Sequence, residues 1–152
     1  MKQFLLFKLG PRHYALEVEE IQEIVENPLL HFIPCAPPFY CGAMNFHGEI
    51  LPVLDLGIYL GLGELDPSDR VIVLAPRIAA LALKVATARR IIALDLQELQ
   101  LTADAAVFDF SSSSFALEGV NVSVLDLIQL LHHLKETFAA SAGMEPVKLP
   151  GN

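Results

Sequence analysis

Residues 33–56 read IPCAPPFYCGAMNFHGEILPVLDL, and this stretch says more about the fold than any other part of the chain. An apolar segment ends in the run Asn45-Phe46-His47-Gly48-Glu49, and a second apolar segment extends from Ile50 to Leu56. Two apolar segments separated by a short polar, glycine-containing run predict two paired strands with a tight turn. Polar side chains held at an exposed turn on a rigid sheet are typical of a docking surface.

The prolines that precede this hairpin, and the short apolar runs that follow it, predict a chain made mostly of strands. Pro34, Pro37 and Pro38 exclude regular strand pairing, and residues 37–40 are expected to open one helical turn. Gly57, Gly61 and Gly63, followed by the run 66–69, predict a boundary between two parts of the chain. Elsewhere, strands are expected at residues 3–9, 14–18, 21–26, 71–75, 78–85, 91–96 and 120–125, with a helical turn near 19–20.

The C-terminal region shows the clearest helical periodicity. Apolar residues from Leu127 to Phe138 recur at helical spacing and predict a helix from Asp126 to about Ala140, with Gly143 beyond its end. Its apolar stripe is expected to pack on the protein's own sheets, although a partner-binding helix is an alternative. Residues 111–114 are interpreted as a polar loop, and residues 144–152 as a flexible tail.

Composition excludes several classes of function. Of 152 residues, 53% are apolar, yet the most apolar region is interrupted by Pro76, Arg77 and Lys84, whereas a membrane-spanning helix needs about 20 apolar residues. Membrane insertion is therefore not expected, and the high mean hydropathy of +0.48 indicates a sheet-rich protein with apolar patches for partners. The net charge of −8 argues against nucleic acid as a partner. The N-terminus lacks the apolar core of a secretory signal, so a cytoplasmic location with reduced cysteines is expected.

Candidate chemical sites are few. Cys35 or Cys41 with His47 could form a hydrolase site or a metal site, but their spacing fits no common zinc motif, and buried structural thiols are the favoured interpretation. Asp126 is expected to cap the C-terminal helix, and Asp55 a turn or loop. The adjacent His132 and His133 are expected to be solvated. No metal, cofactor or catalytic residue is therefore predicted.

The ordered run of residues in and around the hairpin resembles the CheW-like family of chemotaxis coupling proteins. The resemblance extends over nearly the whole chain and is strongest up to Leu56. It includes FLLFKLGPRHYALEVEEIQEI near the N-terminus, VIVL from Val71, and VSVLDLIQLL from Val122. The hairpin motif has fixed spacing, with matching residues at Pro37, Phe39, Gly42, Asn45, Gly48, Pro52, Asp55 and Leu56.

The resemblance implies an all-β fold of two SH3-like five-stranded barrel subdomains packed together, with a C-terminal helix. One domain would span residues 1–143. The first barrel would occupy about residues 13–66, and the second about 69–125 together with the N-terminal strand. The implied function is that of a non-catalytic adaptor, which joins the cytoplasmic tip of a chemoreceptor to the regulatory domain of a CheA-like histidine kinase. A divergent module in a non-flagellar pathway, or a competitor of the usual adaptor, is the alternative.

The resemblance also implies partner-binding residues. They lie on two segments of the chain and comprise Ile21, Gln22, Glu23, Gly42, Asn45, Phe46, His47 and Gly48. Aspartate in place of Ile21 or Gly42 is expected to weaken partner binding while the fold survives.

Position 47 departs from the family pattern, in which an arginine occupies the turn and can pair with the glutamate matching Glu23. A guanidinium is always charged and forms a bidentate fork. An imidazole has an ordinary pKa of about 6.5 and offers one directional hydrogen bond. His47 is therefore expected to hold Glu23 less firmly as the pH rises, with altered partner specificity.

Overall fold

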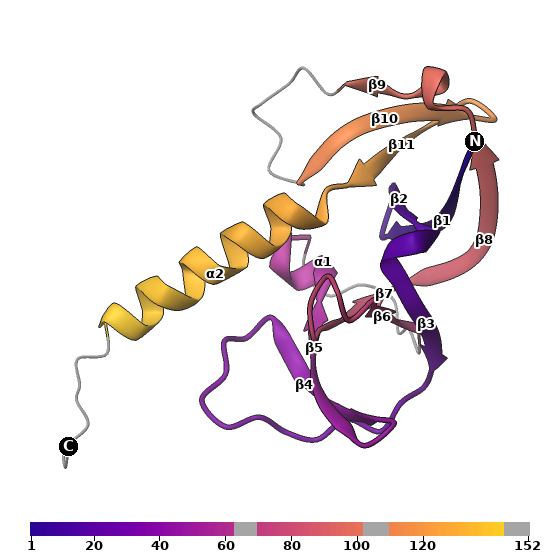
Figure 1. Ribbon diagram of the computed structural model, residues 1–152. Coiled ribbons are helices and arrows are strands. Elements are labelled where there is room, and N and C mark those ends of the chain that lie inside the picture. Colours follow the sequence, from indigo (N-terminus) through magenta and orange to yellow (C-terminus); the bar gives the residue numbers. More distant parts are fainter. Residues whose placement is uncertain (63–69, 102–109, 145–152) are drawn as a thin grey trace, which may run out of the picture.

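Two sheets and a C-terminal helix make up the computed structural model, which describes residues 1–62, 70–101 and 110–144 (Figure 1). The five-stranded sheet has the order β3 (Ile21–Glu26), β6 (Arg70–Leu74), β7 (Ala82–Val85), β5 (Glu49–Asp55), β4 (Tyr40–Phe46). The six-stranded sheet has the order β8 (Thr87–Leu94), β1 (Lys2–Leu9), β2 (Arg12–Glu17), β11 (Val120–Leu125), β10 (Ser111–Leu117), β9 (Gln100–Leu101). The helical elements are η1 (Val18–Glu20), α1 (Leu56–Tyr59), η2 (Leu96–Glu98) and α2 (Leu127–Met144).

The predicted class, mainly β with two sheets and a C-terminal helix, is confirmed, but the strands divide between the sheets differently from the expected boundaries. Gly10, with a φ of 61°, turns the chain so that β2 folds back on β1 as a hairpin and joins the same sheet. β6 lies between β3 and β7, so residues 70–85 belong with the hairpin β4–β5 and not with the second sheet. The expected limits of 13–66 and 69–125 are wrong for this reason, and the second sheet has six strands because the two-residue β9 extends it.

Three apolar clusters explain the high hydropathy of the strands. Successive residues of a strand point to opposite faces, so a strand with both faces buried is apolar throughout. In β6, Val71 and Val73 face the interior of the five-stranded sheet, whereas Ile72 and Leu74 face a core shared with the other sheet. Phe4 in β1 belongs to a third cluster, inside the six-stranded sheet. Much of the apolar content is therefore used internally.

The shared core between the sheets holds the largest buried side chains. Phe7 and Tyr14 are each 1% exposed, and their rings stack with centroids 5.7 Å apart. Leu54 and Leu83 meet them from the five-stranded sheet. One continuous apolar contact therefore holds the two sheets together as a unit.

The region predicted least accurately lies between the hairpin and the last strand. Residues 111–114 form the first half of β10 rather than a loop, because their backbone groups pair with β11 and β9 whatever the polarity of the side chains. Ser113 is 8% exposed, which a small hydroxyl side chain can tolerate. The predicted strand over 78–85 is shorter and begins at Ala82, and the strand predicted at 91–96 begins earlier, at Thr87, and ends at Leu94. Residues 66–69 lie outside the described part.

Local helical structure was predicted correctly at 19–20, where η1 forms, but not at 37–40, where the chain makes a turn with Tyr40 N–H donating to the Pro37 carbonyl at 3.0 Å. The short helix α1 was not predicted. Asp55 begins it by accepting a hydrogen bond from Ile58 N–H at 3.1 Å, so the expected capping role of this carboxylate is confirmed.

Helix α2 begins as predicted, because the Asp126 carboxylate accepts hydrogen bonds from Ile128 N–H at 3.0 Å and Gln129 N–H at 3.2 Å. Leu127 and Leu130 are buried in the shared core, which confirms that the stripe packs on the protein's own sheets there. The helix continues through Gly143 to Met144, beyond its predicted end, and extends away from both sheets (Figure 1). Among the described residues no helix is long and apolar enough to cross a membrane. Residues 145–152 lie outside the described part.

Candidate functional site

The turn between β4 and β5 is a two-residue turn with an exposed histidine at its tip. His47 and Gly48 have φ angles of 51° and 88°, and this pair of positive values is typical of tight hairpin turns. The Asn45 side-chain oxygen accepts a hydrogen bond from Gly48 N–H at 3.0 Å, which holds the turn in place. Phe46, which was expected to contact partners, is only 8% exposed and belongs to the interior cluster. It therefore supports the turn from below.

Gly42 has a structural role that the sequence did not reveal. Its φ is 150°, and a Cβ atom placed there would lie 3.0 Å from both the His31 carbonyl oxygen and the Leu30 Cβ. The close approach arises because His31 and Ala43 exchange two backbone hydrogen bonds of 2.8 Å, which lay the loop before β4 against that strand. Replacement of Gly42 by aspartate would therefore strain the fold, contrary to the expectation that the fold survives.

The Glu23–His47 contact joins two edge strands that lie at opposite ends of the sheet order. β3 and β4 are the edges of the five-stranded sheet, which curves so that Glu23 and the β4–β5 turn lie on the rim of one hollow. His47 Nε2 lies 3.6 Å from Glu23 Oε1, with the side chains 72% and 50% exposed. This distance exceeds that of an ordinary hydrogen bond, and the pair is ionic when the imidazole is protonated. The two segments implied by the resemblance therefore meet in space, through a weak, solvent-screened contact instead of the expected hydrogen bond.

The β3 residues differ in accessibility. Gln22 and Glu23 are exposed, whereas Ile21 is half-buried and packs on the shared core. A bulge between Ile21 and Glu23 interrupts the pairing of β3 with β6. Gln22 and Glu23 are thus open to a partner, and Ile21 also contributes to the protein's own packing.

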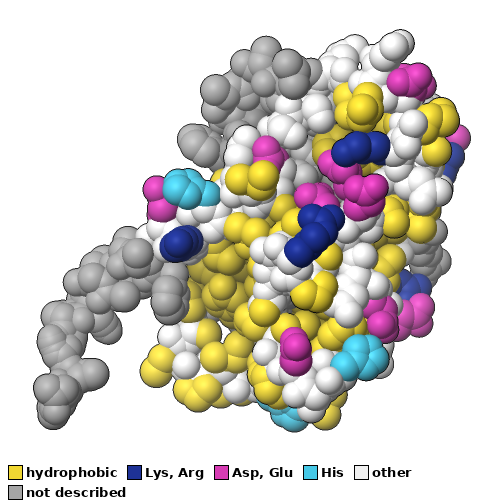
Figure 2. Space-filling view, in the orientation of Figure 1, with side chains coloured by type: hydrophobic (Ala, Val, Ile, Leu, Met, Phe, Trp, Pro, Cys, Tyr) yellow, Lys and Arg dark blue, Asp and Glu magenta, His cyan; other side chains and the backbone are white. Residues whose placement is uncertain are grey.

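Exposed apolar side chains near the turn were not identified from the sequence. Leu29 is 76% exposed and lines the same hollow as Glu23 and His47. Ile50, opposite Asn45 in the hairpin, is 65% exposed. The sequence did contain a signal for such exposure, namely apolar residues in a loop broken by prolines, where no face of a sheet can cover them. Figure 2 shows hydrophobic side chains gathered below α2 and across the lower part of this face.

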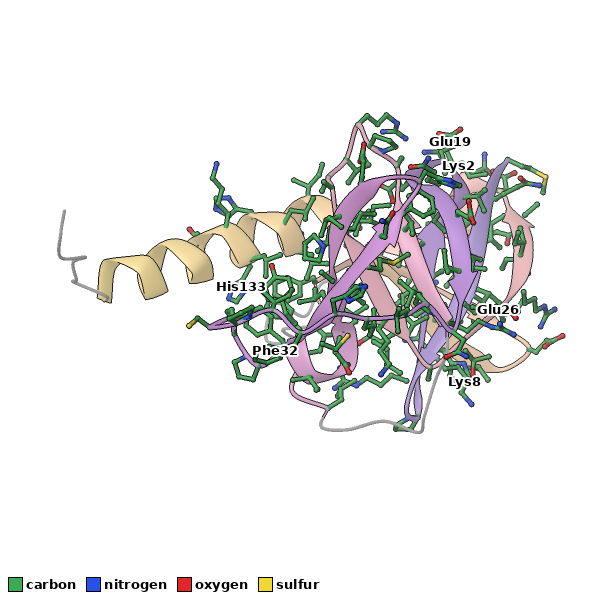
Figure 3. All side chains as sticks on the ribbon, turned by 90° about the horizontal axis from the view of Figure 1, so that it is seen from below. Lys2, Lys8, Glu19, Glu26, Phe32 and His133 are labelled. Carbon is green, nitrogen blue, oxygen red and sulfur yellow. The ribbon has the colours of Figure 1, made fainter. Side chains whose placement is uncertain are left out.

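Phe32, on the same loop, is 86% exposed, and Figure 3 places it at the periphery of the molecule. The loop thus carries two large apolar side chains, Leu29 and Phe32, that the protein does not bury itself. In a folded protein, exposed apolar groups beside a polar rim are a feature of interaction surfaces.

Among the described residues, no hydrogen bond joins Cys35 or Cys41 to His47. Cys35 is exposed, so the prediction of a buried thiol is wrong for this residue. Burial raises the pKa of the Cys41 thiol, the opposite of what a nucleophile requires, and its Sγ contacts the Val53 carbonyl at 3.5 Å. Within the described ranges, no group of three or more metal-ligating side chains is present.

His133 is more engaged than the sequence indicated. Its Nδ1 lies 2.6 Å from the Tyr59 hydroxyl, and its ring contacts Phe110 with centroids 5.1 Å apart. The contact ties α2 to α1 beside the shared core. His133 is exposed, as expected, but it also makes this contact with Tyr59, whereas the exposed His132 pairs with Glu136 one helical turn away at 3.3 Å.

Glu20, directly before β3, has a pKa raised to about 7. Burial of the carboxyl group is the main cause, and the negative charge of Glu17 adds to it. Arg77 lowers the pKa, Asp126 raises it and Lys2 lowers it, each to a smaller extent. Glu20 therefore carries a proton over a pH range in which an ordinary glutamate is ionised.

We expect Glu20→Gln to stabilise the protein at pH 8 but not at pH 4. The folded pKa of about 7 exceeds the ordinary value of 4.5, so native stability falls as the pH rises through this window. For a half-exposed group the gain is discounted to roughly 1 kcal/mol. Urea denaturation at both pH values measures it, with Glu19→Gln as the control for loss of one exposed negative charge. The same stability change at both pH values would contradict the expectation.

The chain is similar to proteins of a known family. The family described as CheW-like domain matches residues 3–135. The chain is 23% identical to "Chemotaxis protein CheW" of Rhizobium meliloti over 83% of this chain and 84% of that protein. It is 34% identical to "Protein FrzA" of Myxococcus xanthus over 47% of this chain and 46% of that protein. Several of these alignments, including the one with "Probable chemotaxis protein CheW" of Rhizobium etli, span about half of the relative's length, 50% in that case.

A solved structure has the same fold. It is described as the scaffolding protein TtCheW from Thermoanaerobacter tengcongensis, and it superposes with a TM-score of 0.72 at 23% identity, covering 82% of this chain and 88% of that one. At this identity the likeness shows the fold alone, with its two SH3-like subdomains.

Proposed function

The chain belongs to the CheW-like domain family, and from this premise we propose that it couples chemoreceptors to a CheA-type histidine kinase in the cytoplasm of a bacterium. The family is one of chemotaxis adaptor proteins and not of enzymes. An adaptor of this kind acts by position: it holds receptor and kinase so that the state of one biases the activity of the other.

The observation that supports the proposal most directly is the surface formed by Glu23, Leu29, Asn45, His47 and Ile50, here termed the turn surface. It combines two exposed apolar side chains, Leu29 and Ile50, with the polar groups of β3 and the β4–β5 turn. Protein interfaces rest on a few apolar anchors surrounded by polar groups that fix orientation. Because the turn is held by the Asn45–Gly48 hydrogen bond, a partner would meet a largely pre-formed surface.

We expect Leu29→Asp to weaken binding of a cognate kinase regulatory domain or receptor tip by about tenfold or more. The substitution removes an apolar side chain that the partner would bury, and it places a charge where the partner would displace water. The matched control is Ile128→Asp on α2, because Ile128 is 79% exposed and Leu29 76%, so each substitution costs the free protein little. Calorimetric titration with each partner separately measures the affinities. Equal affinities for Leu29→Asp, Ile128→Asp and the native protein would contradict the site.

The same titration with His47→Arg tests the effect of the histidine that occupies position 47 in place of the family's arginine. A guanidinium can form two hydrogen bonds to the Glu23 carboxylate where the imidazole lies 3.6 Å away. If partner binding depends on how firmly the turn is held, His47→Arg alters affinity by severalfold. Absence of binding to either partner by both forms, with a native circular dichroism spectrum, would reject the adaptor proposal, whereas binding to one partner and not to the other would favour a competitor role.

A further inference from the structure

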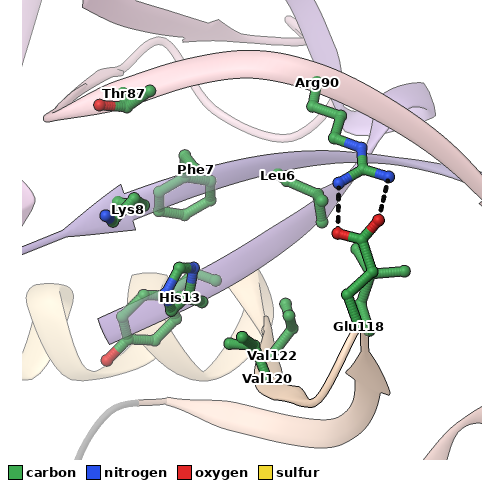
Figure 4. Close-up of a pocket in the computed structure, with 11 residues that line it drawn as sticks. Leu6, Phe7, Lys8, His13, Thr87, Arg90, Glu118, Val120 and Val122 are labelled. Carbon is green, nitrogen blue, oxygen red and sulfur yellow. Dashed lines mark hydrogen bonds and ion pairs between the residues drawn. The ribbon is translucent and has the colours of Figure 1, made fainter. Parts of the chain in front are cut away.

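The six-stranded sheet encloses a pocket of about 220 Å³ at a distance from the turn surface. Its apolar wall is formed by Leu6 of β1, Leu117 of β10, and Val120 and Val122 of β11 (Figure 4). Val120 is 38% exposed, so the wall is accessible from outside. Phe7 and Tyr14 of the shared core also line the pocket, whereas Leu6, Leu117 and Val122 belong to the cluster inside the six-stranded sheet.

The rim of the pocket is basic, although the protein as a whole is acidic. Lys8, His13 and Arg90 line it, and Glu118 is its one acidic residue, whereas the whole chain carries a net charge of −8. Arg90 is already neutralised, because its two terminal guanidinium nitrogens lie 3.2 and 3.4 Å from the Glu118 carboxylate oxygens. Lys8 makes no ion pair with another described residue. Figure 4 shows the Arg90–Glu118 pair at one end of the pocket and Lys8 and His13 toward the other.

We propose that this pocket binds a small amphipathic anion, with its hydrocarbon part against Leu6, Val120 and Val122 and its carboxylate beside Lys8 and His13. Apolar walls with a few convergent polar groups are the usual make-up of a small-molecule site. The hydrocarbon part gains from leaving water, and the charge at the Lys8 end determines which way the ligand lies.

Charge complementarity selects an anion over other small occupants. A cation would be repelled by Lys8, and a neutral hydrocarbon would leave the Lys8 end of the pocket unmatched. The Arg90–Glu118 pair leaves its end of the pocket without net charge, so the carboxylate is drawn to the Lys8 end. Because the pocket lies in the six-stranded sheet and the turn surface in the five-stranded sheet, this binding is independent of the proposed coupling function.

Octanoate is a suitable probe, and octanol is its uncharged counterpart with the same chain length. The full chain, with labelled methyl groups, is titrated with each compound and followed by NMR. We expect saturable shifts of the Leu6, Val120 and Val122 methyl signals with octanoate, and binding of octanol weaker by about fivefold, the usual scale of one partly exposed charge contact. Absence of saturable shifts at these methyl groups would overturn the proposal.

Two rim variants are expected to change octanoate affinity in opposite directions. Lys8→Gln weakens it by about fivefold, whereas Glu118→Gln strengthens it by a few fold, because Arg90 is released from its partner and the nearby negative charge is removed. Lys135→Gln, on the exposed side of α2, is the control for loss of one positive charge. Loss of affinity in both rim variants would indicate damage to the pocket, and equal affinity in all forms would show that charge is not recognised; either result contradicts an anion site.

Discussion

Phe7→Ala is expected to lower the free energy of unfolding by about 3–5 kcal/mol, the largest effect of any single substitution considered for this protein. Phe7 is 1% exposed, stacks on Tyr14 and lies in the core shared by both sheets. Removal of its ring would leave a cavity that the surrounding β-strands cannot close, because their backbones are held by pairing on both sides of β1. Since the shared core joins the two sheets, the loss should be felt by the whole molecule.

The matched control for this prediction is Phe32→Ala. Phe32 is 86% exposed on the loop before β4, so its truncation should change stability by no more than about 0.5 kcal/mol. The chain has no tryptophan, so urea denaturation followed by far-ultraviolet circular dichroism is the suitable measurement. Equal destabilisation by the two substitutions would show that Phe7 does not occupy a close-packed core. A separate early transition in Phe7→Ala would show that the two sheets unfold independently.

Gly42→Ala is expected to destabilise the protein by about 2–4 kcal/mol, more than a comparable change at the neighbouring turn. The new methyl group would lie 3.0 Å from the His31 carbonyl oxygen and from Leu30 Cβ, and the residue would have to keep a φ of 150°. Relief would require the loop before β4 to move away and give up the two His31–Ala43 backbone hydrogen bonds. The strain and the lost hydrogen bonds both contribute to the cost.

Gly48→Ala separates these causes, because Gly48 also has a positive φ, 88°, but no atom lies within 4 Å of its would-be Cβ. Its substitution should cost only the backbone strain, about 1 kcal/mol. Denaturation midpoints of the two variants provide the comparison. If Gly48→Ala is as destabilising as Gly42→Ala, the close approach to His31 is not what constrains Gly42. The result also bears on function, because reduced partner binding by a Gly42 variant is interpretable only where the variant is folded.

Much of the architecture could be predicted from local patterns. The β4–β5 hairpin, the strand at 120–125 and the helix start at Asp126 each follow from signals within a few residues: a turn glycine, an apolar run or a capping carboxylate. The motif spacing within 33–56, together with the segments before and after it, carried the resemblance to the family. Prediction failed at 111–114, where serines form a strand, because pairing with β9 and β11 depends on segments distant in the sequence.

The candidate site shows the same division. The sequence indicated that Glu23 and His47 belong together, through the resemblance, but not how they meet or that Phe46 faces inward. Leu29 was missed because a loop residue has no periodicity from which its exposure could be judged.

By itself, the sequence determined a mainly β chain with a tight polar turn and a capped C-terminal helix, because these features depend on neighbouring residues, and its resemblance to the CheW-like family implied an adaptor. Only the tertiary structure decided that β6 and β7 join the first sheet, that Gly42 is held against His31, and that Leu29 lies beside His47. Each of these features depends on hydrogen bonds between backbone groups far apart in the sequence and on which apolar surfaces become buried against each other. The order of residues within a short segment does not specify either of them.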